Sequence, residues 1–307
     1  MGVELNPTRL RGGLLGLLIG DALGVPYEFH QAASIPTPSK IEMTPPPGFE
    51  RTHDGVPPGT WSDDGAQALA LLDALLRDSE LNLDTFASNL LSWFHRGAFT
   101  PDGKVFDVGL QTQRAFQALR SGVHPAAAGP SDEHDNGNGS LMRCLPVVMV
   151  ASSREHAIRL ARKQSLVTHG HARAQLCCAL YCLTAVGILE GLSAADAVRA
   201  AENELLERYT GQSEETELKI ALDGRFDAPQ GSGYVVDSLW SAVHCVLSTH
   251  SYEACVKRAV SLGNDTDTTA AIAGGLAGIL YGEDALPERW LEALREKAII
   301  EHWLAKL

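Results

Sequence analysis

Residues 9–23 read RLRGGLLGLLIGDAL, and this stretch decides the fold. It is apolar along nearly its whole length, and small residues recur at Gly12, Gly13, Gly16 and Gly20. Small residues on a helix let a second helix approach closely. The stretch therefore predicts a core helix that packs tightly against another helix.

The rest of the 307 residues extends this helical pattern. A hydrophobic fraction of 45% excludes a disordered chain, and the low aromatic content of 6% favours closely packed helices over a β-sandwich. No strand alternation or fixed repeat is evident. We predict a single all-α domain over residues 1–307, with a Pro- and Gly-rich surface loop at 36–59 and a plain connection at 210–232. Helices are expected at 9–23, 63–76, 83–96, 109–119, 155–165, 173–190, 194–208, 235–247, 252–261, 268–280 and 287–307.

Charge and cysteine content limit the possible partners. Lys and Arg number 25 against 38 Asp and Glu, a net charge of −13, whereas a protein that binds nucleic-acid backbones needs a positive surface. The six cysteines form no CxxC pair, which indicates buried thiols in a reducing compartment. Residues 1–11 lack a signal-peptide pattern, and the apolar stretch 174–189 is shorter than a membrane span. We expect a cytoplasmic location, no membrane and no nucleic-acid partner.

Two acidic clusters stand far apart in the sequence, Ser62-Asp63-Asp64 and Asp265-Thr266-Asp267-Thr268. Each places two carboxylates and a hydroxyl at the start of a predicted helix. Such hard oxygen ligands suit Mg²⁺, Mn²⁺ or Ca²⁺ better than Zn²⁺, although the later Gly and Glu of an EF-hand are missing. Four carboxylates that converge would repel one another unless cations lie between them, and two cations are plausible. The alternative is that both clusters only cap helices.

Two further carboxylates are candidates for proton transfer. Glu28 lies between Tyr27 and Phe29, so it is either a group with a raised pKa or a surface residue. Asp107 precedes the helix expected at 109–119. Its position favours a helix cap over a second catalytic carboxylate.

Three other segments suggest ligand contacts. Residues 134–140, HDNGNGS, offer backbone N–H groups that could cradle a phosphate or form a tight turn, without a GxGxxG or P-loop pattern. His169 and His171 are either polar core residues or ligand contacts. A zinc site is not indicated, because no third zinc ligand is spaced near them. Tyr234, in the segment GSGYVVDSLW, could stack on a base or fill a gap.

These segments occur together in one known order: GLLIGDALGVPYEF, GTWSDDGAQALALL, FDVG, GNGSLMRCLPV, VTHGH, GSGYVVDSLW and GNDTDTTAAIAGGLAG. The order resembles that of ADP-ribosylglycohydrolases over residues 11–282, most closely the bacterial branch that includes the dinitrogenase reductase-activating glycohydrolase. The resemblance implies an orthogonal all-α bundle around two Mg²⁺ or Mn²⁺ ions.

The resemblance also implies residue roles. Its metal ligands would be Ser62, Asp63, Asp64, Asp265, Asp267 and Thr268, and its catalytic residues would be Asp107 and Glu28. ADP-ribose would be held by Gly137, Asn138, Gly139, His169, Gly233 and Tyr234. Gly65 stands where relatives commonly have Thr. This difference affects a residue that would contact the metal ligands, not a metal ligand itself.

The implied activity is metal-dependent hydrolysis of the N-glycosidic bond of ADP-ribosyl-arginine, because Asp107 matches the acid of arginine-specific relatives. The substrate would be an ADP-ribosylated protein or small molecule, and ADP-ribose the product. Two alternatives remain open. One is hydrolysis of another linkage, to serine, a nucleic-acid base or a small molecule. The other is a non-catalytic module that binds ADP-ribose or confers immunity.

Overall fold

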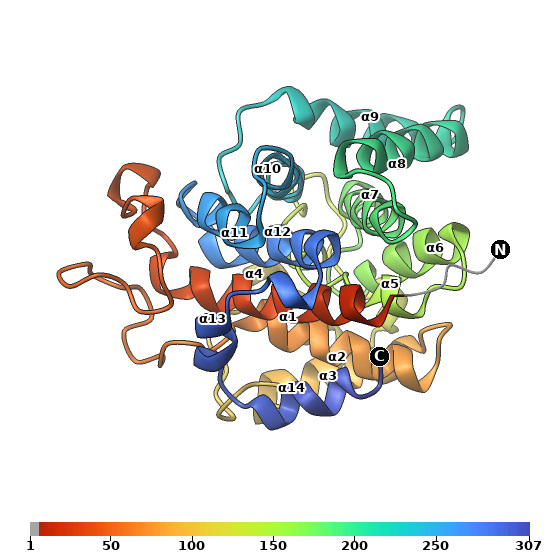
Figure 1. Cartoon of the computed structure of the whole chain (residues 1–307). Coiled ribbons are helices and arrows are strands. Elements are labelled where there is room, and N and C mark those ends of the chain that lie inside the picture. The colour runs from red at the N-terminus through yellow and green to blue at the C-terminus, as the bar shows by residue number, and fades with distance from the viewer. Residues whose placement is uncertain (1–5) are drawn as a thin grey trace.

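The computed structural model describes residues 6–307, and in this range the chain is built from helices joined by turns (Figure 1). Its only β contacts there are two isolated bridges, so the prediction of an all-α fold is confirmed. The helices are α1 Pro7–Gly24, α2 Asp63–Arg77, α3 Leu83–Arg96, α4 Leu110–Arg120, α5 Val147–Val150, α6 Arg154–Ser165, α7 Ala172–Leu189, α8 Ala194–Tyr209, α9 Glu215–Asp223, α10 Val235–Leu247, α11 Tyr252–Val260, α12 Thr266–Tyr281, α13 Glu288–Ala293 and α14 Lys297–Leu304.

Helices α1 and α12 form the central pair and lie side by side in Figure 1. Their backbones approach so closely that a methyl group added at Gly16 would lie 2.4 Å from the carbonyl oxygen of Gly274. At Gly20 the same group would lie 2.1 Å from the carbonyl oxygen of Ala270. Only glycine permits this approach, so the expectation of a tight helix pair is met. The pair matters for function because α12 begins with an acidic cluster and α1 carries Asp21.

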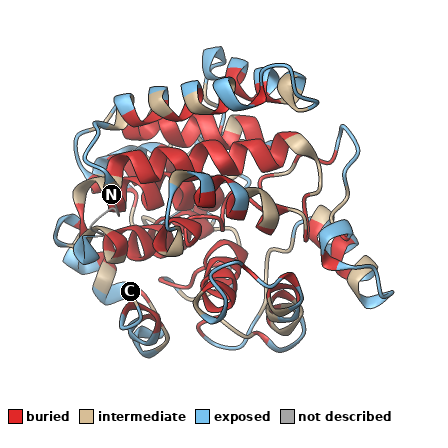
Figure 2. Ribbon diagram, turned by 90° about the vertical axis from the view of Figure 1, so that its right-hand side faces the viewer, coloured by how far each residue is buried: buried red, intermediate tan, exposed pale blue. Residues whose placement is uncertain are grey.

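Helix α7 is buried along almost its whole length. Figure 2 shows that buried residues gather in the central helices of the bundle, whereas exposed residues lie at its edges. By length and composition this 18-residue helix could span a membrane, but 89% of it is buried among the other helices. It packs against α6, α8 and α9. Its apolar character is accounted for by its place in the core.

Two expectations about the chain's second half were wrong. The segment 210–232 is more than a connection, because it contains α9, whose Leu218, Ala221 and Leu222 form a buried face. The helix expected over 287–307 is interrupted between α13 and α14. There the buried Leu294 is extended and Glu296 has a φ of 48°, so Trp290 and Trp303 enter the core from two separate short helices. The free energy gained by burying these side chains exceeds the cost of interrupting the helix.

The loop at 36–59 is irregular as expected, apart from one 3-10 turn at Pro38–Lys40. It projects from one side of the bundle in Figure 1. Tyr27 anchors its base, since its hydroxyl donates a 2.8 Å hydrogen bond to the carbonyl of Glu42.

Candidate active site

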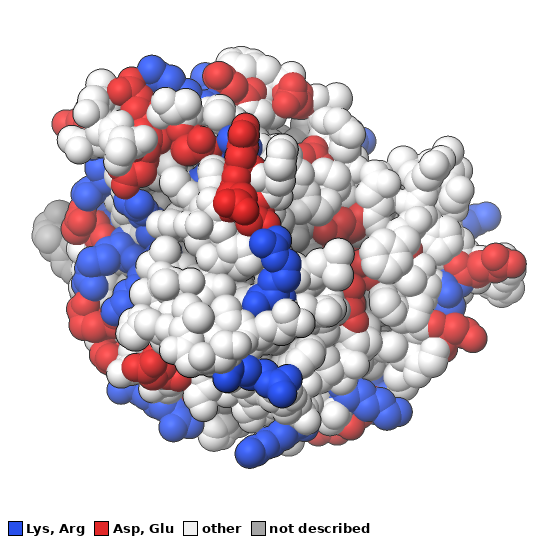
Figure 3. Space-filling model, turned by 180° about the vertical axis from the view of Figure 1, so that it is seen from behind, with Lys and Arg blue, Asp and Glu red and all other residues white. Residues whose placement is uncertain are grey.

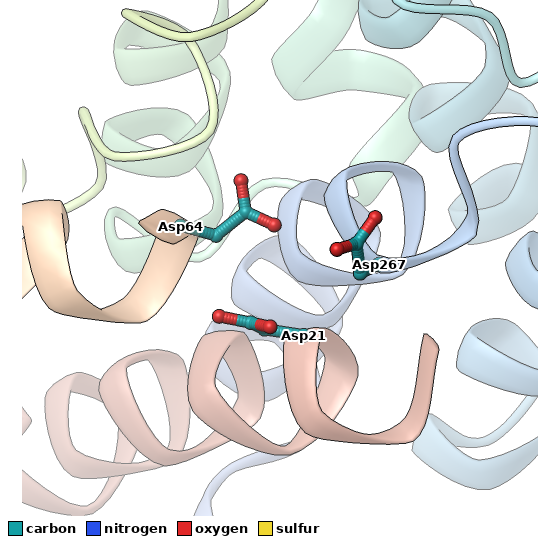
Figure 4. Close-up of side chains that lie close together, drawn as sticks. All are labelled: Asp21, Asp64 and Asp267. Atoms are coloured by element: carbon teal, nitrogen blue, oxygen red, sulfur yellow. The ribbon is translucent and has the colours of Figure 1, made fainter. Parts of the chain in front are cut away.

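The two acidic clusters meet where α2 and α12 begin. Carboxylate oxygens of Asp64, Asp267 and Asp21 all lie within 4.8 Å of one another, and Figure 4 shows the three side chains turned toward a shared space. The Thr268 hydroxyl donates a 3.2 Å hydrogen bond to Asp64 across the junction. The fold therefore brings side chains about 200 residues apart into one site.

Asp21 is the member of this group that the sequence analysis missed. Its carboxylate accepts hydrogen bonds from the backbone N–H of Ser62 at 2.8 Å and of Gly65 at 2.8 Å, so it caps α2 from another helix. Gly65 has no room for a side chain, because a methyl there would lie 2.7 Å from Leu18 and 2.8 Å from Trp61. The signal available in the sequence was a single Asp within the apolar stretch GLLGLLIGDAL of a predicted core helix.

A second acidic group adjoins the first and shares Asp267 with it. Oxygens of Glu28, Asp265 and Asp267 also lie within 4.8 Å of one another. Reciprocal backbone hydrogen bonds hold this part together: the N–H of Phe29 donates to the carbonyl of Asn264, and the N–H of Asn264 donates to the carbonyl of His30, both at 2.6 Å. The turn after α1 is thereby held against the turn before α12.

The carboxylates of this site are buried at a cost that a cation would relieve. Burial raises the pKa of Asp64 and Asp267 well above the ordinary value, and nearby carboxylates raise it further. Burial raises the pKa of Asp21 to about 7, against the lowering effect of its two backbone donors. One buried oxygen each of Asp64 and Asp267 has no hydrogen-bond partner. These orphaned oxygens, in two adjoining acidic trios, fit a site for hard divalent cations.

The other predicted metal ligands surround these trios. The Ser62 hydroxyl caps α2 by accepting from the N–H of Asp64 at 3.4 Å. Asp63 accepts a 3.0 Å hydrogen bond from Gln67 and faces a cavity. Ser62, Asp63 and Thr268 stay predicted ligands, whereas Asp64, Asp265 and Asp267 belong to the trios.

A cavity of about 590 Å³ opens beside the acidic groups. One side, here called the acidic wall, consists of Glu28, Asp63, Asp107 and Asp265. A second part of the lining, here called the glycine wall, consists of Gly137, Gly139, Gly233 and His169, and it adjoins the acidic wall where Gly233 lies next to Asp265. The predicted catalytic residues and most predicted ADP-ribose contacts therefore line a single cavity.

The glycine wall is built by the loop at 134–140 and the turn before α10. Gly137 and Tyr234 form an antiparallel bridge, and the N–H of Asn138 donates to the carbonyl of Gly233 at 3.1 Å. The N–H of Gly137 donates to the side chain of Gln111 at 3.2 Å. Two of the backbone N–H groups expected to bind a phosphate, those of Gly137 and Asn138, are thus used in hydrogen bonds that hold the loop in place.

Two predicted contact residues have other partners. The side-chain amide of Asn138 donates to Asp265 at 2.8 Å and to Ser238 at 2.9 Å, so it orients a carboxylate of the acidic wall. The Tyr234 hydroxyl accepts from Arg173 at 3.1 Å. Tyr234 is not among the described residues that line the cavity.

Comparison with known proteins matches this chain to one family. The ADP-ribosylglycohydrolase family model aligns with residues 4–307. The chain belongs to the ADP-ribosylglycohydrolase family. It is 31% identical to ADP-ribosylarginine hydrolase Tri1 of Pseudomonas putida, over 92% of this chain and 73% of that protein. It is 29% identical to the ADP-ribosyl-[dinitrogen reductase] glycohydrolase of Rhodospirillum rubrum, over 94% and 91% of the two chains.

A solved structure agrees with this assignment. The chain superimposes on an ADP-ribosylglycohydrolase-related protein complex with a TM-score of 0.79 and 30% identity, covering 98% of this chain and 96% of that one. The fold is therefore the helical bundle of ADP-ribosylglycohydrolases, which act on ADP-ribosylated substrates. In this family member, the acidic trios are the residues that could hold the metal.

Asp107 does not cap α4 in this ADP-ribosylglycohydrolase, so the position-based interpretation was wrong. The cap is Gly109, and Asp107 has a φ of 51° and faces the cavity. Burial, with the nearby Asp265 charge, raises the pKa of Asp107 to about 6. A left-handed Asp beside a cavity is strained, and such strain concentrates at functional sites.

Glu28 is also buried, and it contacts a residue that the sequence analysis did not single out. A 2.7 Å hydrogen bond joins its carboxyl group to the His53 ring, which stacks 5.1 Å from Phe106 and 6.0 Å from Phe29. Burial, then the Asp107 and Asp265 charges, raise the pKa of Glu28 to about 10. His53 comes from the loop at 36–59, so this loop contributes a hydrogen-bond partner to a carboxyl group that lines the cavity.

The surface outside the cavity is mixed in charge. On the face shown in Figure 3, Lys and Arg side chains are scattered among Asp and Glu side chains, without a continuous basic area on that face.

Proposed function

We propose that this chain is a metal-dependent ADP-ribosylarginine hydrolase that cleaves the bond between ribose C1″ and a guanidinium nitrogen. The observation that carries the proposal is that Glu28 and Asp107 line one cavity together with Asp265, and that Glu28 and Asp265 also belong to the second acidic trio. Similarity to a protein described as an ADP-ribosylarginine hydrolase supports the linkage.

The lining near Phe29 suits a planar cation. Phe29 is 68% exposed and lines the cavity together with Glu28 and Asp107. A guanidinium group pairs with carboxylates and stacks on aromatic faces, whereas a serine hydroxyl gains little from either contact. The neutral glycine wall would take the ADP part, because no carboxylate of that wall repels a diphosphate.

Asp64, Asp265, Asp267 and Asp21 would hold one or two Mg²⁺ or Mn²⁺ ions. The ions would supply fixed positive charge that binds and orients the ribose hydroxyls. Asp107, with a pKa of about 6, is suited to exchange a proton near neutral pH.

In the proposed reaction, Asp107 gives its proton to the leaving guanidine nitrogen as the C1″–N bond breaks. A cation held by the trio that includes Glu28 would lower the pKa of Glu28 and leave it ionised, so that Glu28 accepts a proton from water as the water oxygen bonds to C1″. The products are ADP-ribose and unmodified arginine, and one water is consumed. The developing positive charge on the sugar is stabilised by the surrounding carboxylates.

The test compares an ADP-ribosyl-arginine peptide with an ADP-ribosyl-serine peptide, with Mg²⁺, Mn²⁺ or EDTA, by mass spectrometry. We expect release of ADP-ribose from the arginine peptide only, and only with a divalent cation. Asp107→Asn should lower kcat/KM by about 10²–10⁴-fold, the usual contribution of general acid–base catalysis. The matched control is Asp102→Asn, since Asp102 is exposed in the same connecting segment.

Preferential cleavage of the serine peptide would reassign the linkage. ADP-ribose binding in calorimetry, with no turnover of either peptide, would instead identify a binding module. Full activity in EDTA after exhaustive dialysis would overturn the metal dependence.

A further inference from the structure

Arg143 is a fully buried guanidinium whose hydrogen-bond partners are all neutral. It donates to the Gln67 side chain at 2.6 Å, to the Gln164 side chain at 3.0 Å and to the Thr168 hydroxyl at 2.7 Å. It also lies over the ring of Phe86 at 5.1 Å. Burial of a charge without a paired carboxylate is expensive, so a core position for arginine calls for a reason.

The first reason lies on the side of the acidic wall. Arginine only donates, so the Gln67 oxygen must face Arg143 and the Gln67 amino group must face the other way. There it donates to Asp63 at 3.0 Å. Arg143 thus fixes the orientation of the Gln67 amide, which in turn holds one oxygen of Asp63 as an acceptor.

The second reason lies on the side of the glycine wall. The Thr168 hydroxyl accepts from Arg143 at 2.7 Å and lies 2.8 Å from Nδ1 of His169. If Nδ1 carried the hydrogen, the hydroxyl hydrogen would have no acceptor among its contacts in the described chain. All groups are satisfied only when the hydroxyl donates to Nδ1, which leaves the hydrogen of neutral His169 on Nε2.

The Nε2 edge of His169 faces the loop that forms the glycine wall. A methyl group added at Gly139 would lie 3.2 Å from Nε2, and one added at Gly137 would lie 3.5 Å away. Burial, and then the Arg143 charge, hold the pKa of His169 well below its ordinary value. The ring is therefore a neutral donor at a wall where the amides of Gly137 and Asn138 are already used.

We propose that Arg143 is a positioning residue that sets the direction of hydrogen bonding on both walls of the cavity. Through Thr168 it holds His169 as the Nε2–H tautomer, which donates to an oxygen of the ADP-ribose moiety. Through Gln67 it orients Asp63 beside the metal-binding carboxylates. The ligand in this statement rests on the proposed function, whereas the tautomer does not depend on it.

The test separates the two arms with substitutions that nearly conserve volume. Thr168→Val removes the hydroxyl relay to His169 and leaves Gln67 in place. Gln67→Met removes the relay to Asp63 and leaves Thr168 in place. Arg143→Met removes both relays. The matched control is Thr210→Val, because Thr210 is exposed and its hydroxyl bonds only within the end of α8.

The first readout is the tautomer of His169 in the full chain with ¹⁵N-labelled histidine, from long-range ¹H–¹⁵N spectra assigned with His169→Gln. We expect hydrogen on Nε2 in the wild type, Gln67→Met and Thr210→Val, and a mixture of tautomers in Thr168→Val. Hydrogen on Nδ1 in the wild type, or an unchanged tautomer in Thr168→Val, would overturn the proposal.

The second readout is binding. Thr168→Val should weaken ADP-ribose binding about three- to tenfold in calorimetry, the loss of one hydrogen bond, with Mn²⁺ binding unchanged. Gln67→Met should weaken Mn²⁺ binding by about tenfold, followed by electron paramagnetic resonance, with the tautomer unchanged. If both variants weaken both ligands equally, Arg143 serves only the core and the proposal fails.

These outcomes are distinct from failure of the proposed function. If the wild type shows the Nε2–H tautomer but binds no ADP-ribose, the proposed substrate is wrong, whereas the proposed direction of the hydrogen bonds from Arg143 to His169 stands. If Arg143→Met does not fold, the two single-arm variants decide the matter alone.

Discussion

The two walls of the cavity differ in charge: the acidic wall is formed by carboxylic side chains, and the glycine wall contains none. In the acidic wall, burial and the charges of nearby carboxylates raise the pKa values of Glu28, Asp63 and Asp107, so bound protons or cations would stabilise it. The glycine wall carries no charge, and its one ionisable side chain, His169, is held neutral. The comparison teaches that a chain of net charge −13 can still form a stretch of cavity lining without carboxylates, and under the proposed function this stretch is where a diphosphate would bind.

The largest expected effect comes from removing the charges of Asp64 and Asp267, the carboxylates next to the acidic wall that would bind the metal. Asp64→Asn with Asp267→Asn should lower kcat/KM on ADP-ribosyl-arginine by at least about 10³-fold, because a bound cation supplies several kcal/mol of charge stabilisation. Turnover with saturating Mn²⁺ is the measurement. Asp227→Asn, at an exposed position, is the control. Near-wild-type turnover of the double variant would eliminate the metal site as described.

A smaller effect should follow from a change confined to the glycine wall. Gly139→Ala would place a methyl group 2.8 Å from Cε1 of His169, so the ring or the loop must shift. We expect ADP-ribose to bind about tenfold more weakly, while Mn²⁺ binds as in the wild type. Gly55→Ala is the matched control, because a methyl there meets no atom within 4 Å. Equal weakening of both ligands would mean that the walls are not independent.

The smallest expected effect concerns stability and pH in the metal-free protein. Burial raises the pKa of Asp21 to about 7 and of Asp107 to about 6, above the ~3.9 of an unfolded Asp. The folded state therefore holds more protons in this window. The contribution of these groups to stability is fully present below about pH 4 and is lost as the pH rises through 6 and 7.

Thermal unfolding in EDTA should thus show a Tm that falls by several degrees between pH 5 and pH 8, about 2–4 °C for each kcal/mol lost. Added Mn²⁺ should raise the Tm most at pH 8, because protons and cations compete for the same oxygens. A Tm that rises toward pH 8 in EDTA would contradict the raised pKa values.

The sequence analysis predicted correctly the features that depend on neighbouring residues, and it missed features that depend on contacts between distant residues. Helix α3 and helix α10 have the predicted bounds, because capping and apolar periodicity are local. The break before α14 was missed, since burial of Trp290 and Trp303 from two directions is a tertiary requirement. Asp21 was missed for a similar reason, because its partners are amides at the start of another helix, the first of them 41 residues later at Ser62.

The sequence by itself determined the helical class, the close contact of a glycine-rich helix and the presence of two acidic helix starts. Each of these depends on neighbouring residues, whose spacing and size can be read directly. Only the tertiary structure decided which carboxylates share a cation site, that Asp107 faces the cavity, and that Arg143 connects the two walls. Electrostatic and hydrogen-bonding energies depend on distance and burial in space, and the order of residues along a chain does not specify either.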